Sequence, residues 1–271
     1  MTAEILRAWA VWCVCTGALG LIAVQRQRLF IQFGRPELFT GWIVLTLLLF
    51  LGAFNIRKRL SMLPLGRAST WLRLHVAIGI LALAVFWLHT GTVWPHGLYE
   101  QALALLFYAL SLNGILGYFL QRIYPPRLTQ TGLEIIYEQI PTELADLRRR
   151  AEVLVLACTK DTATDVLAQH YQQTLSWFFR QPRFFLSHVF GGLKGEYWVR
   201  YQCSTVERYL NPVERDHLTR LAALAQLKNL IDVHYAAQSV MKWWLLIHVP
   251  LAVATLALTA WHVVLVHIYA V

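Results

Sequence analysis

Five stretches of the sequence run for 17 to 29 residues without a single Asp, Glu, Lys or Arg. A helix that crosses a bilayer needs about 20 consecutive apolar residues, so each stretch has the composition and approximate length of a transmembrane helix. The overall composition agrees, since 57% of the 271 residues are hydrophobic and only 14% are charged. The five uncharged stretches are Ala8–Val24, Leu38–Ile56, Leu74–Pro95, Gln101–Gln121 and Trp243–Val271.

These stretches divide the chain into three parts. Residues 1–121 contain four predicted transmembrane helices, residues 122–241 form a polar insert, and residues 242–271 contain the fifth helix. We therefore predict an all-α integral membrane protein, a five-helix transmembrane bundle with a mostly helical soluble insert between helices four and five. The first stretch follows Arg7 and also has the form of a secretory signal peptide. It lacks a small-x-small cleavage site, which favours the transmembrane interpretation.

The insert has its own local signals. Pro125 and Pro126 are expected to end the fourth helix, because proline lacks a backbone donor. Residues 142–157 alternate apolar and charged side chains at helical spacing, whereas the glycine-containing, aromatic segment Arg180–Cys203 favours irregular structure or a short β-ribbon. The tetrapeptide Asn211–Glu214 has an N-cap, a proline at the first helical position and an acid at the third. A long helix is predicted to begin there and to continue into the last apolar stretch.

Charge placement predicts the orientation in the membrane. The connector Asn55–Arg73 carries five Lys and Arg residues, whereas the connector Thr90–Glu100 carries none. By the positive-inside rule, the first connector, the N-terminus and the insert are cytoplasmic and the C-terminus is outside, as expected in a bacterial inner membrane. Arg26, Arg28 and Arg35 fall on the outer side and weigh against this orientation. The net charge of +9 shows no basic stripe interleaved with aromatics, so no nucleic-acid partner is predicted.

Histidines occur in the third and fifth apolar stretches with the same spacing. His75 and His89 are 14 residues apart, and so are His248 and His262. In a helix this spacing comes within about 40° of a whole number of turns and rises roughly 21 Å, so each helix shows two histidines on one face. The two helices run in the same direction, which places His75 and His248 at the cytoplasmic level and His89 and His262 at the outer level. Intramembrane histidines usually face the protein interior and have a partner.

This pattern predicts two haem groups. Two neutral imidazoles on opposite sides of a porphyrin give the axial ligation of a b-type haem, and a bilayer core of about 30 Å has room for two such haems. Gly79, one turn after His75, leaves space for a flat ring, and Arg67 and Arg73 lie near the expected propionates of the inner haem. Small residues also mediate ordinary helix packing, and juxtamembrane arginines also set topology.

The paired histidines resemble those of dihaem membrane cytochromes b, including the cytochrome b of quinol-oxidising bc complexes. Their placement on helices three and five is also similar to the membrane domain of ferric reductases and NADPH oxidases. The resemblance is limited to the ligand histidines and about 50 residues around them, and the large insert before the second ligand helix departs from it. It implies two haems b with His75, His89, His248 and His262 as ligands, and it leaves the substrate open.

An electron-transfer subunit is the function that this resemblance implies. It would carry electrons across the membrane between a quinone or a soluble redox partner on one side and a redox partner on the other, with a c-type cytochrome or a flavin or iron–sulfur protein as candidate partners. Two alternatives remain open: a haem-containing transmembrane reductase of a ferric complex or oxygen, and a haem-free membrane anchor. Four interpretations of His267 stay open: a group that supports an outer ligand, an alternative outer ligand, part of a third site together with His96, or an ordinary interfacial histidine.

Overall fold

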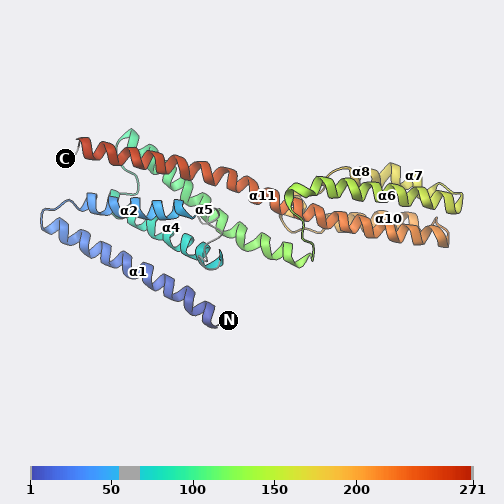
Figure 1. Ribbon diagram of the computed structural model, residues 1–271, viewed down its shortest axis with the longest axis horizontal. Helices are drawn as coiled ribbons and strands as arrows, with labels where there is room; N and C mark the ends of the chain where they lie inside the picture. Colours follow the sequence, from blue (N-terminus) through green and yellow to red (C-terminus); the bar gives the residue numbers. More distant parts are fainter. Residues whose placement is uncertain (1, 55–67, 270–271) are drawn as a thin grey trace. The chain divides into compact units, whose positions relative to one another are not determined.

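The computed structural model describes residues 2–54 and 68–269, and within these ranges every regular element is helical (Figure 1). The chain forms two compact units. Unit 1 is Met1–Phe119 together with Trp244–Val271, and unit 2 is Leu120–Trp243. Five of the described helices are long and apolar enough to cross a membrane. The predicted all-α class and the five apolar helices are therefore confirmed.

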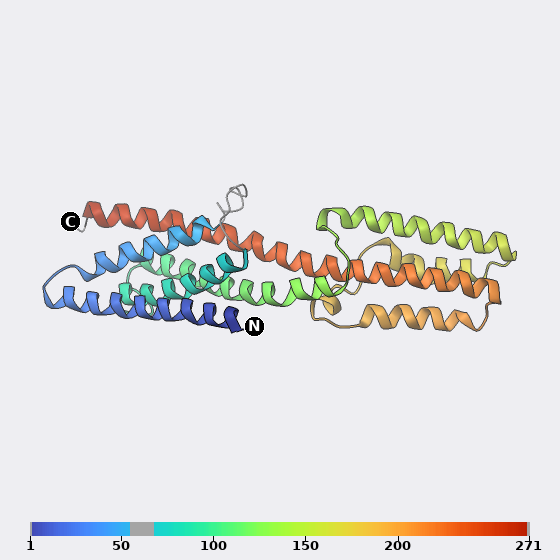
Figure 2. The same cartoon turned by 60° about the horizontal axis from the view of Figure 1, so that its bottom comes forward.

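Unit 1 is a bundle whose helices lie lengthwise alongside one another (Figure 2). Its interior combines small side chains such as Ala82 and Ala104, both 0% exposed, with the stacked rings of Phe86 and Phe107, while many other large apolar side chains point outward. Close approach through small residues is typical of helices that pack in a bilayer. The helices are α1 (Thr2–Ile31), α2 (Pro36–Ala53), α4 (Ala68–Thr90), the first part of α5 (Leu98–Gln130) and the last part of α11 (Pro212–Tyr269).

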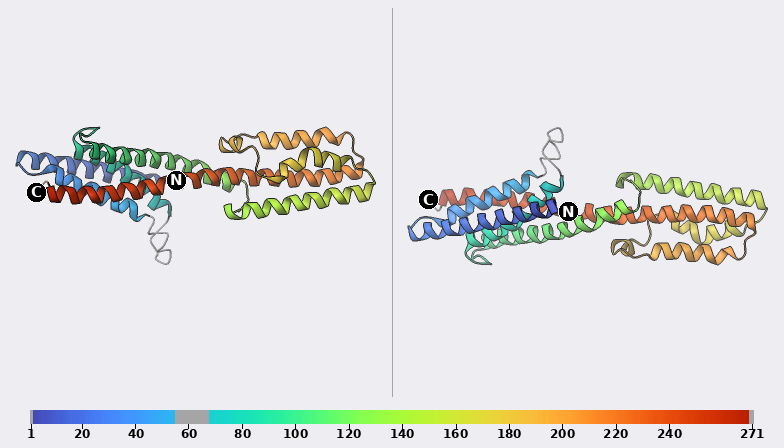
Figure 3. Two further views of the ribbon diagram at one scale, coloured as in Figure 1. Left: turned by 90° about the horizontal axis from the view of Figure 1, so that it is seen from above. Right: turned by 90° about the horizontal axis from the view of Figure 1, so that it is seen from below.

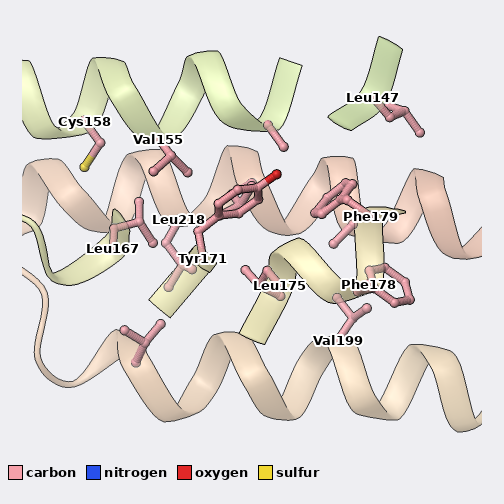
Figure 4. Packing of buried hydrophobic residues seen from close by; sticks show 14 of the residues in the cluster. Leu147, Val155, Cys158, Leu167, Tyr171, Leu175, Phe178, Phe179, Val199 and Leu218 are labelled. Carbon is pink, nitrogen blue, oxygen red and sulfur yellow. The ribbon is translucent and has the colours of Figure 1, made fainter. Parts of the chain in front are cut away.

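Unit 2 has a core of its own. Apolar residues of α6 recur every three or four positions, and this face, with Leu147, Ala151 and Val155, packs against aromatic residues such as Phe178 and Phe179 (Figure 4). An amphipathic helix of this kind is stabilised mainly by the burial of its apolar stripe. The elements that precede α11 in unit 2, after the end of α5, are a 3₁₀ turn (Tyr137–Gln139), α6 (Ile140–Thr162), α7 (Val166–His170), a π-helical segment (Tyr171–Leu175), α8 (Ser176–Arg180), α9 (Phe185–Val189) and α10 (Lys194–Glu207).

Two local predictions for the insert were wrong. Helix α5 does not end at Pro125 and Pro126 but continues through both to Gln130. Proline already has a helical φ, and both prolines are exposed, so water can satisfy the carbonyls that lose their usual donors. The segment Arg180–Cys203 is not a β-ribbon, because it folds into α9 and most of α10. Gly191 and Gly192 lie in the turn between the two helices, where Gly191 has a φ of +75°.

The predicted start of the long helix is confirmed. Helix α11 begins at Pro212, the Asn211 backbone N–H donates to Glu214 Oε2 at 2.8 Å, and the Glu214 N–H donates to Asn211 Oδ1 at 2.9 Å. This reciprocal arrangement is a capping box. From there α11 runs for 58 residues, through unit 2 and into unit 1.

A buried polar cluster interrupts the core of unit 2. Lys228 and Asp232 of α11 are 0% and 1% exposed, and Lys228 Nζ lies 2.6 Å from Asp232 Oδ2. Lys228 Nζ also donates to the Gln181 carbonyl at 2.9 Å and lies 3.9 Å from the centroid of the Phe178 ring. Nearby, His188 is 5% exposed and neither of its ring nitrogens has a hydrogen-bond partner among the described residues. Burial, reinforced by the Lys228 charge, lowers the pKa of His188 to about 4.

We expect this histidine to make unit 2 sensitive to acid. An unfolded histidine titrates near pH 6.5, so between pH 6.5 and 4 the unfolded chain binds a proton that folded His188 does not. The neutral, buried form of His188 contributes fully to the free energy of unfolding above about pH 6.5. This contribution is lost as pH falls toward 4, by up to about 3 kcal/mol over that range. Thermal unfolding of the wild type and of His188→Leu at pH 7.5 and pH 5 measures this loss. An equal loss of stability in both proteins contradicts the prediction.

Candidate functional site

The candidate site in unit 1 lies between the two helices that carry the paired histidines. Figures 1 and 2 show that α4, with His75 and His89, and the end of α11, with His248 and His262, belong to the same bundle. The rings of His89 and His262 lie next to each other in a T-shaped arrangement, with centroids 6.4 Å apart and planes at 87°. The predicted outer pair therefore meets in space although 173 residues separate its members in the sequence.

A cavity of about 350 Å³ opens at this pair. Three imidazoles border it, His89 from α4 and His262 and His267 from α11, while the remaining lining is largely apolar with a few polar groups at the edge. Pockets for cofactors commonly have this size and this mixture of apolar walls and a few placed polar groups. The other lining residues are Glu37, Leu38, Gly41, Trp42, Val44, Leu48, Phe86, Thr90, Pro95, Glu100, Leu103, Phe107, Thr259, Val263 and Val266.

His89 is held by the first turn of α2. Its Nδ1 lies 3.0 Å from the Glu37 carbonyl oxygen, and a methyl group added at Gly41 would lie 3.0 Å from His89 Cε1. A carbonyl oxygen only accepts, so Nδ1 carries the hydrogen and Nε2 keeps its lone pair. A histidine that donates through one ring nitrogen to a backbone carbonyl is oriented to bind a metal through the other.

His262 packs against Tyr99, the second residue of α5. The two rings are stacked at 6.0 Å and 17°, and the Tyr99 hydroxyl donates to the Leu258 carbonyl at 2.8 Å. This hydrogen bond fixes the phenol beside the histidine. His267 makes a different contact, since its Nδ1 donates to the Val263 carbonyl one turn earlier at 2.8 Å and its ring meets Trp42 edge-on at 5.6 Å.

His248 is held by the middle of α5. Its Nδ1 lies 3.0 Å from Asn113 Oδ1, its ring stacks on Trp244 at 5.2 Å, and the absence of a side chain at Gly114 lets it approach α5. The amide oxygen of Asn113 accepts the Nδ1 hydrogen, so Nε2 of His248 is again left with its lone pair. His89 and His248 thus share one arrangement, in which Nδ1 donates to an oxygen atom on another helix. That oxygen is supplied by α2 for His89 and by α5 for His248.

His75 differs from the other three predicted ligands. Its Nδ1 is buried without a hydrogen-bond partner among the described residues, and its ring lies 4.9 Å from that of Phe54. The rings of His75 and His248 pack on Phe54 and Trp244. Among the described residues, no ring contact joins the two members of the inner pair as one joins the outer pair.

The sequence also predicted that Gly79, Arg67, Arg73 and His96 lie at or near the haem sites. A methyl group added at Gly79 would meet nothing within 4 Å, so the space next to this position on α4 is open. Arg73 is partly buried two residues before His75, and Arg67 lies outside the described residues. His96 is exposed in the connector between α4 and α5 and does not border the cavity.

Sequence reasoning missed several residues that contact the histidines, among them Glu37, Tyr99 and Asn113. Glu37 acts through its backbone carbonyl, which carries no sequence signal. Near this site, Arg26 of α1 has a buried Nε with no hydrogen-bond partner among the described residues, and its Nη2 would lie 3.9 Å from a methyl group added at Gly91, which follows α4. Asn113 carried a usable signal, because it is an amide in the middle of an apolar stretch, where a polar side chain needs a partner.

Comparison of the chain with protein-family models, with curated proteins and with solved structures gives no match. The resemblance to cytochromes b therefore depends on the histidines alone. Among residues 2–54 and 68–269, no group of three or more His, Cys, Asp or Glu side chains gathers in a way that would hold a metal ion. Axial ligation of a haem needs only two protein ligands, because the porphyrin supplies the other four.

Proposed function

We propose that the chain is a dihaem b-type cytochrome subunit of the membrane. His89 and His262 would hold the outer haem, and His75 and His248 the inner one. The observation that carries the proposal is the outer pair. Metal–imidazole bonds are about 2 Å long, so two rings bound to opposite sides of one metal ion have centroids roughly 6 Å apart, close to the 6.4 Å between His89 and His262.

The surroundings of the histidines support the same proposal. The Glu37 carbonyl and Asn113 Oδ1 accept from Nδ1 of His89 and His248 and so leave Nε2 of both rings free to bind iron. When bound, haem supplies the one-electron redox chemistry. The helices fix the separation of the two sites along the bundle, roughly 21 Å for 14 residues.

The proposal includes a place in the cell and a set of partners. We propose insertion into a bacterial inner membrane with the N-terminus and unit 2 in the cytoplasm, as the distribution of Lys and Arg favours. The chain would then pass electrons between a quinone or a soluble redox protein on one side and a second redox protein, such as a c-type cytochrome or a flavin or iron–sulfur protein, on the other.

The direct test is the haem content of the purified chain. A pyridine haemochrome assay on protein solubilised in detergent is expected to give two haems b per chain. Because each iron would have two histidine ligands, the reduced spectrum is expected to be low-spin and unchanged by carbon monoxide. Protein that contains no haem after expression with adequate haem supply would support the membrane-anchor alternative. A carbon monoxide shift would indicate an open axial position and favour a transmembrane reductase.

A substitution at Asn113 tests how the inner site is held. Asn113→Leu removes the acceptor that orients His248, and loss of such a partner typically weakens binding at a metal site by 10- to 100-fold. We expect faster loss of the inner haem to apomyoglobin and no change in the outer haem. Asn113→Asp keeps an acceptor oxygen at the same place and is expected to retain the inner haem longer than Asn113→Leu. Equal loss from both variants contradicts a role for this hydrogen bond.

A further inference from the structure

Unit 2 exposes a group of large apolar side chains around its short helix α9. Leu186 is 70% exposed, Phe190 82% and Leu193 54%, and Phe185 is 37% exposed beside them. These four residues are named here the α9 surface. Soluble surfaces rarely gather large apolar side chains in this way unless another apolar phase covers them.

The α9 surface is tied to the end of α5. The Tyr124 hydroxyl donates to the Val189 carbonyl at 3.2 Å, and Arg127 Nη1 donates to the same oxygen at 3.4 Å. Gly191 allows this close approach, because a methyl group there would lie 3.1 Å from Arg127 Nη1. Within unit 2, both views of Figure 3 show α9 at the end that contains the last turns of α5.

Tyr124 and Arg127 follow closely on an apolar stretch of the same helix. This uncharged stretch of α5, Gln101–Gln121, has 21 residues. At 1.5 Å per residue it is about 30 Å long, which is the thickness of the hydrocarbon core of a bilayer. If α5 spans a bilayer, Tyr124 and Arg127 lie within two turns of the end of the span, where the lipid headgroups begin. The Val189 carbonyl that both residues bind, and with it the backbone of α9, is then held near the headgroups.

The charges beside the α9 surface suit an anionic lipid surface. The segment Arg180–Lys194 contains three basic residues and no Asp or Glu. The Arg183 guanidinium lies 4.0 Å from the ring of Trp177, which is itself 43% exposed. Tryptophan and arginine are enriched where proteins meet headgroups, and basic residues near the cytoplasmic leaflet are attracted by its anionic lipids.

We propose that the α9 surface inserts into the cytoplasmic leaflet and that its partner is a bilayer containing anionic lipid. Apolar side chains of α9 enter the outer part of the acyl region while Arg180, Arg183 and Lys194 contact headgroup phosphates, as in interfacial helices of peripheral proteins. This contact anchors unit 2 to the membrane at a point separate from α5 and α11. It depends on the insertion of α5 and not on the presence of haem.

Lipid photo-crosslinking of the unmodified chain tests this proposal. The protein is reconstituted in vesicles of phosphatidylcholine with about one third phosphatidylglycerol and a lipid that carries a diazirine near the headgroup. Trypsin releases Phe184–Lys194, which contains the whole α9 surface, and Tyr209–Arg215, which contains the 70% exposed Tyr209 at the far end of α10. We expect at least tenfold more lipid adduct on the first peptide, and a clear reduction in the variant Leu186→Ser/Phe190→Ser.

Trypsin also releases Leu74–Arg122, called here the α5 peptide, which contains most of α4 and the whole of Gln101–Gln121. Its labelling by a lipid with the diazirine deep in the acyl chain shows that the spans have inserted. If this peptide is labelled while Phe184–Lys194 is labelled no more than Tyr209–Arg215, the proposal is overturned and another protein or a second copy covers the α9 surface. If the α5 peptide is unlabelled, the membrane insertion on which the proposal depends is itself wrong. Circular dichroism of the Ser variant checks that it remains folded.

Discussion

A His262→Ala variant is expected to contain one haem b per chain instead of two, whereas a His267→Ala variant is expected to keep both. The two histidines are five residues apart on α11 and both border the cavity, but only His262 faces His89. Nδ1 of His267 is already bonded to a carbonyl of its own helix, and its ring meets Trp42. Haem quantification against protein concentration in the two variants measures the difference.

The pairing of ligands gives a stricter form of the same test. His89→Ala is expected to remove the same haem as His262→Ala, so the reduced spectra of the two variants should superimpose. His75→Ala is expected to remove the other haem. Loss of a haem in His267→Ala with retention in His262→Ala would mean that the third imidazole of the cavity is the outer ligand. If His75→Ala and His262→Ala lose the same haem, so that their reduced spectra superimpose, then His75 and His262 bind one haem together and the assumed direction of the two helices is wrong.

The largest expected effect on stability is at the buried ion pair of unit 2. Lys228→Met leaves the Asp232 carboxylate buried without its cation, and breaking a buried pair in this way typically costs about 3–5 kcal/mol. Burial already works against both charges, since it raises the pKa of Asp232 to about 6 and lowers that of Lys228 to about 8. Hydrogen exchange of peptides from α6 and α8 in the full chain is expected to speed up markedly in the single variant.

The double variant Lys228→Met/Asp232→Leu supplies the control for this prediction. It removes both charges and fills the space with apolar groups, so we expect it to recover most of the lost protection. The exposed pair Arg220–Asp216 on the same helix, with side chains 65% and 60% exposed, offers a second comparison. Arg220→Met is expected to change protection little, because exposed pairs contribute less than about 1 kcal/mol. If Lys228→Met and Arg220→Met reduce hydrogen-exchange protection by similar amounts, burial does not control the free energy lost when one member of an ion pair is removed.

Much of unit 1 was predictable because the signals are local. An uncharged stretch of sufficient length must be a helix in lipid, since no other single segment satisfies its own backbone there. The spacing of His75 from His89, and of His248 from His262, fixes the face of each helix by the same local geometry. The cap at Asn211 and Glu214 involves neighbours in the sequence and was predicted for the same reason.

Predictions failed where local signals were ambiguous. Pro125 and Pro126 break a helix only if the freed carbonyls cannot be satisfied, and the sequence does not say whether they face water. The aromatic residues of Arg180–Cys203 have β propensity, but two of them, Phe184 and Trp198, pack against Phe178 in the core of unit 2, a contact between helical elements that the sequence does not reveal. The sequence also gives no sign that Lys228 is fully buried, because lysine side chains are almost always exposed unless they are paired.

The sequence by itself determined the five long apolar helices, the capped start of α11 and the spacing of the histidines along α4 and α11, because these follow from hydrogen bonds and periodicity within one segment. Only the tertiary structure decided that the Glu37 carbonyl meets His89, that Asn113 meets His248 and that Asp232 and Gln181 surround Lys228. Most of these partners come from different helices. These contacts depend on how each helix is shifted and rotated relative to its neighbours. Side-chain packing between the helices fixes both, and no single segment of the sequence specifies it.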